Sequence, residues 1–210
     1  MANSDKSVSC IRQQQKLCLG AMLTVYGDIR SGNCLKVKWL LDRLGHDYRW
    51  IETDVTSGAT RSPEFLALNP AGQTPTAVLE GGRPLAQSNA ILLYFGEGTP
   101  FIPGDRYDRA RMMEWLFWEQ YSHEPYIAMV RFQRALAGKR ADEIEPRLVE
   151  RARMETGLAQ GDWLVGDGPT LADLALVAYT RVAPEGDFDL AAYPSVVAWI
   201  GRVEDAFGIR

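Results

Sequence analysis

The chain has 210 residues, of which 46% are hydrophobic, and its 23 basic and 27 acidic residues give a formal net charge of -4. This length allows one large domain or two small ones, and the composition is sufficient for packed cores. The balanced charge, without a long block of Lys and Arg, argues against nucleic-acid binding. No apolar run approaches the roughly 18 residues of a membrane-spanning helix, so we expect a soluble globular protein.

The cysteines and histidines argue against a metal site. Cys10, Cys18 and Cys34 are an odd number without a CxxC pair or a Cys/His cluster, which is typical of a protein in a reducing compartment such as the cytoplasm. The two histidines lie in a predicted turn (His46) and at a predicted helix break (His123). Neither setting favours a histidine-based triad or a metal ligand.

Residues 1–21 are polar and Gln-rich and end in a short apolar run, Leu17–Ala21. A signal peptide is one interpretation. However, the apolar run is short, continues into a predicted strand and lacks a small-x-small cleavage site. We favour the alternative, a disordered extension.

Residues 22–96 carry the pattern of a small α/β domain. The elements expected in chain order are a strand at 23–26, a helix ending at 44, a strand at 48–52, a short helix near 63–66, a strand after Pro75, a Gly81-Gly82 turn with its return strand, and a helix from Ser88. The strand-helix-strand unit requires parallel pairing, whereas the short turn requires an antiparallel pair. The four-stranded sheet is therefore predicted to be mixed.

Residues 97–104 are rich in Gly and Pro and predict a linker, after which residues 105–210 read as all helical. Apolar spacing predicts helices at 107–121, 127–137, 144–158, 171–182 and 196–207, with breaks at Pro125, Gly138, Gly161 and Pro184. The fold class is thus α/β followed by all-α.

Two short motifs in the first domain predict a site for a small peptide. Thr74-Pro75 lies between a Gly-containing turn and a strand, where a cis proline makes a sharp entry and leaves the Thr74 backbone free to pair with an extended ligand. Ser88 opens a helix, and helix N-termini bind carboxylates.

These motifs, in this order of elements, resemble the cytosolic glutathione S-transferase family, in particular bacterial members with a serine-type or cysteine-type active-site loop. The resemblance extends from Met22 to Arg210. It implies a thioredoxin-like N-terminal domain at 22–96 that holds glutathione. It also implies an all-helical domain at 105–210 that supplies most of the pocket for the electrophile.

The resemblance also implies which residues bind glutathione. Thr74, before Pro75, corresponds to the residue that pairs with the cysteinyl backbone, and Gln87 with Ser88 corresponds to the pair that binds the γ-glutamyl end. Gln87 is an amide where Glu or Asp often occurs, so the glutathione ammonium would lose one charged partner. Gln73 matches the position from which members reach the glycine carboxylate, whereas we expect Arg61 to be a surface charge.

A third motif, Gly168–Asp173, resembles the family's N-capping box. Thr170 is expected to cap a buried helix, and Asp173 to accept from the backbone N–H of that cap. The role is structural, and we expect a substitution of Asp173 to destabilise the fold by about 1 kcal/mol or more.

The thiol of glutathione has an ordinary pKa of about 8.5, so an enzyme must stabilise its thiolate. Family members of the serine and cysteine types place their catalytic residue in the loop that opens the first helix. We predict Ser31, whose hydroxyl can donate to sulfur beside the positive end of the helix dipole. A simple helix cap is the alternative role for Ser31, and the side-chain amide of Asn33 is the second catalytic candidate.

Two other residues compete for this role. Cys34 stands three positions after Ser31, which is the spacing of a redox CxxC motif whose first cysteine has become serine. A cysteine in the second helical turn is usually buried and inert, so we expect Cys34 to pack in the core. Tyr26 would match the tyrosine-type members but occupies an apolar strand position, so we expect it to pack as well.

An aromatic cluster on the two helices around residues 123–125 is expected to form part of the electrophile pocket. Part of any such stripe must be core. Tyr121 and Met129 are our first candidates to face the cleft, together with Trp118, and Arg131 is the polar candidate there.

The predicted function is conjugation of the glutathione thiolate to small hydrophobic electrophiles, with glutathione as substrate, no metal and a homodimeric assembly in the cytoplasm. Glutathione-dependent peroxidase, dehalogenase or disulfide-reductase chemistry could use the same site. A non-catalytic glutathione-binding interaction module is a further alternative.

Overall fold

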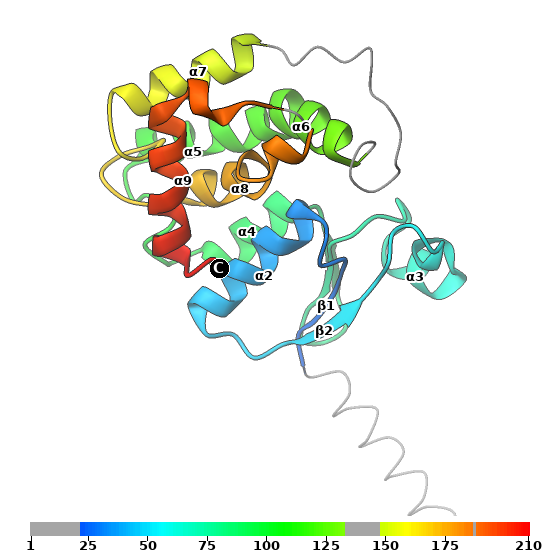
Figure 1. Cartoon of the computed structure of the whole chain (residues 1–210). Coiled ribbons are helices and arrows are strands. Elements are labelled where there is room, and N and C mark those ends of the chain that lie inside the picture. The colour runs from blue at the N-terminus through cyan, green and yellow to red at the C-terminus, as the bar shows by residue number, and fades with distance from the viewer. Residues whose placement is uncertain (1–21, 133–147, 187) are drawn as a thin grey trace, which may run out of the picture.

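The computed structural model describes residues 22–132, 148–186 and 188–210, so the predicted extension at 1–21 lies outside it. The predicted break at Gly138 also falls outside the described residues, as do the end of the helix expected at 127–137 and the start of the one expected at 144–158. Figure 1 shows an α/β unit formed by the first part of the chain, with a helical unit packed beside it.

The α/β unit is built on the predicted four-stranded mixed sheet. Its strands are β1 (Thr24–Gly27), β2 (Arg49–Glu52), β3 (Thr76–Val78) and β4 (Pro84–Ala86), in the order β2-β1-β3-β4. β1 pairs with β2 in parallel, whereas β1 with β3 and β3 with β4 are antiparallel. The prediction of a mixed sheet is confirmed.

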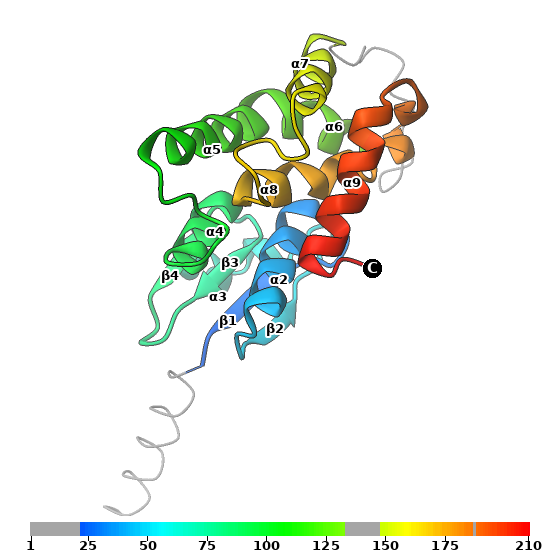
Figure 2. The same ribbon diagram turned by 90° about the vertical axis from the view of Figure 1, so that its left-hand side faces the viewer.

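Helices α2 (Gly32–Leu44) and α4 (Ser88–Gly96) lie between the sheet and the helical unit (Figures 1 and 2). α2 ends where the sequence predicts, because Gly45 adopts φ 70° and its N–H bonds back to the last turn. A short helix, α3 (Pro63–Leu68), is capped by the Ser62 hydroxyl, which accepts from the Phe65 N–H.

The helical unit follows a connection that runs from Gly96 to the start of α5 (Arg106–Trp118). Its other helices are α6 (Glu124–Arg131), α7 (Leu148–Ala159), α8 (Leu171–Thr180) and α9 (Pro194–Phe207), with short 3-10 turns at 183–186 and 190–192. A further 3-10 turn, at 59–61, precedes α3 in the α/β unit. All ten residues of α8 are buried. Within the described ranges, no helix is long and apolar enough to cross a membrane.

The predicted helix break at Pro125 is wrong. A π-helical turn, Glu119–His123 (η2), joins α5 directly to α6, and Pro125 occupies the first turn of α6. A proline is tolerated there because the N–H groups of the first turn have no partner within the helix. The π turn changes which residues of this helical stretch face the α/β unit.

The Thr170/Asp173 capping box is present at the start of α8. The buried Asp173 carboxylate accepts from the Thr170 N–H at 2.8 Å and its hydroxyl at 2.9 Å, and also from Trp199 Nε1 at 2.8 Å and the Leu164 N–H at 3.1 Å. One carboxylate therefore joins α8, α9 and the segment before α8.

Candidate functional site

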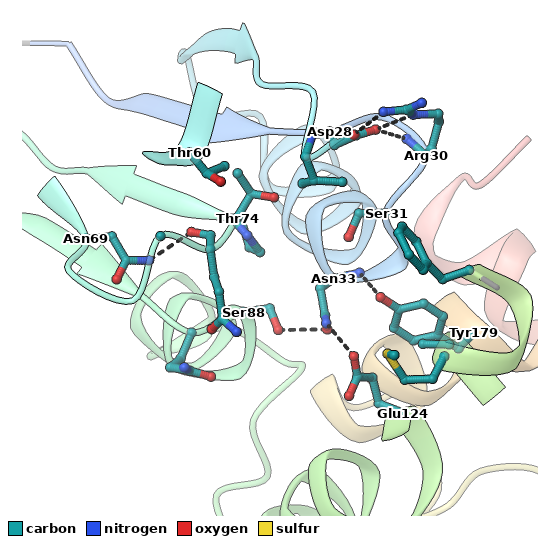
Figure 3. A pocket seen from close by; sticks show the side chains of 18 of the residues that line it. Asp28, Arg30, Ser31, Asn33, Thr60, Asn69, Thr74, Ser88, Glu124 and Tyr179 are labelled. Carbon is teal, nitrogen blue, oxygen red and sulfur yellow. Dashed lines mark hydrogen bonds and ion pairs between the residues drawn. The ribbon is translucent and has the colours of Figure 1, made fainter. Parts of the chain in front are cut away.

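A cavity of about 440 Å³ lies between the loops of the α/β unit and the helices α6 and α8 (Figure 3). Its walls come from segments that are far apart in the sequence. Its lining residues include Asp28, Arg30, Ser31, Asn33, Arg61, Gln73, Thr74, Pro75, Gln87, Ser88, Glu124, Ala128, Met129, Arg131, Phe132 and Tyr179. In the part of the chain that the structure describes, no group of three or more His, Cys, Asp or Glu side chains is placed to hold a metal ion.

The loop between β1 and α2 is held in shape by Asp28. Its nearly fully buried carboxylate accepts from the Arg30 guanidinium at 2.6 Å and from the Val55 N–H at 3.1 Å, and its backbone C=O accepts from the Ser31 N–H at 3.0 Å. The hydrogen bonds from Arg30 hold the pKa of Asp28 below its ordinary value, so it is a carboxylate at neutral pH. Ser31 is thereby presented at the N-terminus of α2.

Ser31 occupies the N-cap position of α2, but its side chain makes no capping hydrogen bond. Ser31 lines the cavity at the positive end of the helix dipole, and its hydroxyl is within hydrogen-bonding reach of Cys34 and Tyr179. Gly32 lets α8 approach this point, because a Cβ there would lie 2.9 Å from carbons of the Tyr179 ring.

Asn33 is bonded to groups from both units (Figure 3). Its Oδ1 accepts from the Ser88 hydroxyl at 3.0 Å, and its Nδ2 donates to Glu124 Oε1 at 3.3 Å. Its backbone N–H donates to the Tyr179 hydroxyl at 3.2 Å. Burial raises the pKa of Tyr179, so this hydroxyl keeps its proton at neutral pH.

Thr74 and Pro75 enter β3 through a cis peptide bond, as the sequence predicts. The preceding turn is held by Asn69, whose Nδ2 donates to the Gln73 C=O at 2.8 Å and to Thr76 Oγ1 at 3.2 Å. Gln73, Thr74 and Pro75 all line the cavity.

Gln87 and Ser88 line the same cavity at the start of α4. Gln87 has φ 70° and is the one non-glycine residue with a positive φ in the described ranges. Such a conformation is costly for a residue with a side chain and persists where the surrounding structure enforces it. Ser88 is almost fully buried.

Cys34 and Tyr26 do not line the cavity. Cys34 is fully buried, and this burial raises the pKa of its thiol, so it is a poor nucleophile. Tyr26 packs edge-on against Phe65, with ring centroids 5.8 Å apart. Cys34 is buried as we expected, whereas Tyr26 is only half-buried and lies outside the hydrophobic core.

The wall formed by α6 differs from the prediction. Met129 lines the cavity, together with Ala128, Phe132 and Arg131, but Tyr121 and Trp118 do not. Tyr121 lies within the π turn and points into solvent, with 83% of its surface exposed. Trp118 is half-buried and stacks on His123 with ring centroids 5.5 Å apart.

Among the lining residues of the helical unit that sequence reasoning missed are Glu124 and Tyr179, both of which bond to Asn33. Tyr179 is the one tyrosine of the mostly apolar, buried helix α8, and a buried tyrosine hydroxyl normally has a polar partner. This need for a polar partner could have marked Tyr179 as a candidate site residue. Arg61, expected to be a surface charge, also lines the cavity, and its Nη1 donates to the Ala71 C=O at 3.3 Å.

Comparisons with known proteins agree with this geometry. Residues 21–97 match the model of the glutathione S-transferase N-terminal domain, and residues 124–205 match the C-terminal domain. A crystal structure of a glutathione S-transferase from Xanthobacter autotrophicus Py2 is 49% identical, with a TM-score of 0.78 over 87% of this chain and 92% of that one.

Two curated relatives carry different activities in their names. Glutathione S-transferase 3 of Zea mays is 35% identical over 85% of this chain and 87% of its own length. The disulfide-bond oxidoreductase YfcG of Escherichia coli is 31% identical over 80% of this chain and 84% of its own length. Both domain matches and these relatives show that the chain belongs to the glutathione S-transferase family.

Proposed function

We propose that the protein is a glutathione transferase that conjugates the glutathione thiolate to small hydrophobic electrophiles. The observation that carries this proposal is the meeting of Ser31 and Asn33 with Thr74, Gln87 and Ser88 around one cavity. A helix N-terminus with a hydroxyl for the thiolate therefore adjoins a backbone segment and a second helix N-terminus for the peptide.

In this proposal, glutathione lies along the α/β side of the cavity. The Thr74 backbone pairs with the cysteinyl residue, and Ser88 at the N-terminus of α4 binds the γ-glutamyl carboxylate. Gln87 contacts the γ-glutamyl end, and Gln73 reaches the glycine carboxylate. Arg61 lines the same end of the site and supplies a positive charge there.

Ser31 is the proposed catalytic residue. Its O–H donates to the sulfur at the positive end of α2, which favours the thiolate over the thiol. The thiol proton passes to solvent, and the sulfur attacks the electrophilic carbon. With an aryl halide, a carbon–sulfur bond forms, the carbon–halogen bond breaks and halide ion leaves. Met129, Ala128 and Phe132 supply the apolar wall for the electrophile.

A second candidate function is reduction of disulfides or peroxides by glutathione at the same site, which the likeness to a disulfide-bond oxidoreductase favours. The sulfur that reacts would be that of glutathione, because Cys34 is fully buried. Parallel assays of conjugation with a generic aryl halide, peroxide reduction and disulfide reduction would separate the two. Glutathione binding without any turnover would favour a non-catalytic module instead.

We also propose a cytoplasmic homodimer. Large aromatic side chains remain exposed on α4, on α5 and in the π turn, among them Tyr94 (51%), Phe117 (66%) and Tyr121 (83%). A dimer interface that covers these side chains would remove their apolar surface from water. Light scattering that gives the monomer mass at micromolar concentration would contradict the dimer.

A further inference from the structure

Glu124 brings a carboxylate from the helical unit to the residues that we assign to glutathione. It is the first residue of α6, directly after the π turn, and it lines the cavity. Figure 3 shows its carboxylate directed at the Asn33 side chain, whose Nδ2 donates to Oε1 at 3.3 Å. These two residues stand 91 positions apart in the chain.

The Asn33 carboxamide is held at both ends. Ser88 donates to its oxygen at 3.0 Å, while Glu124 accepts from its nitrogen. If the amide were turned over, its oxygen would face the Glu124 carboxyl group, and whenever that group is ionised two acceptors would oppose each other. Ser88 does not select between the orientations, since a hydroxyl can both donate and accept. Glu124 is therefore the group that selects the orientation.

This orientation leaves a donor for the ligand. A carboxamide nitrogen carries two hydrogens, and one of them is used by Glu124. The other is available to a sulfur atom in the cavity that Asn33 lines. Asn33 can then add a second hydrogen bond to the thiolate beside that from Ser31.

The groups around Glu124 determine the direction in which its pKa is shifted. Glu119 of the π turn is paired with Lys36 of α2, and both side chains are fully buried. Burial, and then the negative charge of Glu119, raises the pKa of Glu124, while Lys36 and the hydrogen bond from Asn33 act in the opposite direction. Tyr179 of α8 is also nearby, and the charge of Glu124 adds to the effect of burial in raising the pKa of Tyr179.

We propose that Glu124 is a positioning residue that holds the Asn33 carboxamide with its nitrogen available to the glutathione sulfur. This inference rests on the proposed function, and it adds a residue of the helical unit to the thiolate site of the α/β unit.

The first test needs no glutathione. The chain has four asparagines, so selective 15N labelling gives four pairs of side-chain amide signals, and the pair missing in Asn33→Ala belongs to Asn33. We expect Glu124→Ala to shift the Asn33 pair and leave the others in place. Glu97→Ala is the matched control, since Glu97 is 61% exposed and pairs with Arg109. Unchanged Asn33 signals in Glu124→Ala would overturn the proposal.

The second test is a double-mutant cycle on conjugation. Glu124→Ala and Asn33→Ala are each expected to lower kcat by about tenfold, and the double variant also by about tenfold, with KM for glutathione changed by less than about threefold. Glu124→Gln keeps an acceptor oxygen, so we expect an intermediate loss. A loss of about a hundredfold in the double variant would show that Glu124 acts independently of Asn33.

The two tests separate the failure of this inference from the failure of the proposed function. If the wild-type protein neither binds glutathione nor turns over an electrophile, the proposed function fails, while the amide signals still decide whether Glu124 orients Asn33. If the wild type is active and the Asn33 signals do not respond to Glu124→Ala, only the inference about Glu124 fails.

Discussion

Lys36 and Glu119 form an ion pair, with Nζ 3.2 Å from Oε1, in which neither side chain is exposed to solvent. Lys36 lies in α2 of the α/β unit, and Glu119 lies in the π turn of the helical unit. Asn89 of α4 also donates to Glu119, at 2.9 Å. The ion pair therefore connects the α/β unit to the helical unit in the protein interior.

Removing one member of this pair should destabilise the protein strongly. Lys36→Met leaves the Glu119 carboxylate buried without its counter-charge, which costs about 3–5 kcal/mol of unfolding free energy. The double variant Lys36→Met/Glu119→Leu should recover most of this loss, because neither charge is then buried. Urea unfolding monitored by tryptophan fluorescence measures both values.

Lys38→Met is a matched control on the same helix, since Lys38 forms a partly exposed pair with Asp42. Its effect should stay within about 1 kcal/mol. Equal losses in Lys36→Met and Lys38→Met would show that the buried pair does not hold the units together.

Asp173 should matter more for stability than a helix cap alone. Asp173→Ala leaves the donors of Trp199, Leu164 and Thr170 without their buried acceptor, so we expect a loss of about 3 kcal/mol or more. Asp189→Ala is the control, because Asp189 is an exposed cap that accepts from the Ala191 N–H, and it should cost about 1 kcal/mol. Chemical denaturation that gives equal losses would contradict this role.

The capping box illustrates what the sequence could and could not predict. The spacing of Thr170 and Asp173 is a local signal, and it correctly predicted the cap. The bonds from Leu164 and Trp199 are tertiary contacts that no spacing reveals, which is why the expected loss rises from about 1 to about 3 kcal/mol.

The candidate site shows the same difference between local sequence signals and tertiary contacts. Thr74-Pro75 and Ser88 stand at a turn and at a helix start, so their local sequence marked them. Glu124 and Tyr179 meet Asn33 across 91 and 146 positions, respectively. Sequence reasoning failed at Tyr121 because one π turn changes the phase of the helix, and residue spacing alone does not show such a turn.

Glu124 should make stability depend on pH. Burial, and then the charge of Glu119, raises the pKa of Glu124 above its ordinary 4.5, so the folded protein holds this proton more tightly than the unfolded chain. This contribution to stability is fully present below pH 4.5 and is lost as the pH rises through the raised pKa. The Glu124→Gln variant has no titratable group at this position, so its unfolding free energy should not show this decline with rising pH.

Urea unfolding at a series of pH values tests this sign. The unfolding free energy of Glu124→Gln, relative to wild type, should increase as the pH rises above 4.5 and then level off. Parallel pH curves for the two proteins would mean that the pKa of Glu124 is the same in the folded and unfolded states.

Met129 and Tyr121 form a matched pair for the electrophile wall, because Met129 lines the cavity and Tyr121 does not. Met129→Ala removes apolar contact area, so the KM for a hydrophobic electrophile should rise by about threefold to tenfold. Tyr121→Ala should leave this KM unchanged. Steady-state kinetics at saturating glutathione gives both KM values. A larger rise of KM in Tyr121→Ala than in Met129→Ala would show that Tyr121, and not Met129, contacts the electrophile.

The most direct test of the central claim is the pKa of the bound glutathione thiol, measured from the ultraviolet absorbance of the thiolate as pH is varied. If Ser31 stabilises the anion at the N-terminus of α2, the bound thiol should titrate well below its ordinary pKa of about 8.5 in the wild type. In Ser31→Ala, that pKa should rise by about one unit or more while glutathione still binds. The same pKa in both proteins would contradict the assignment of Ser31.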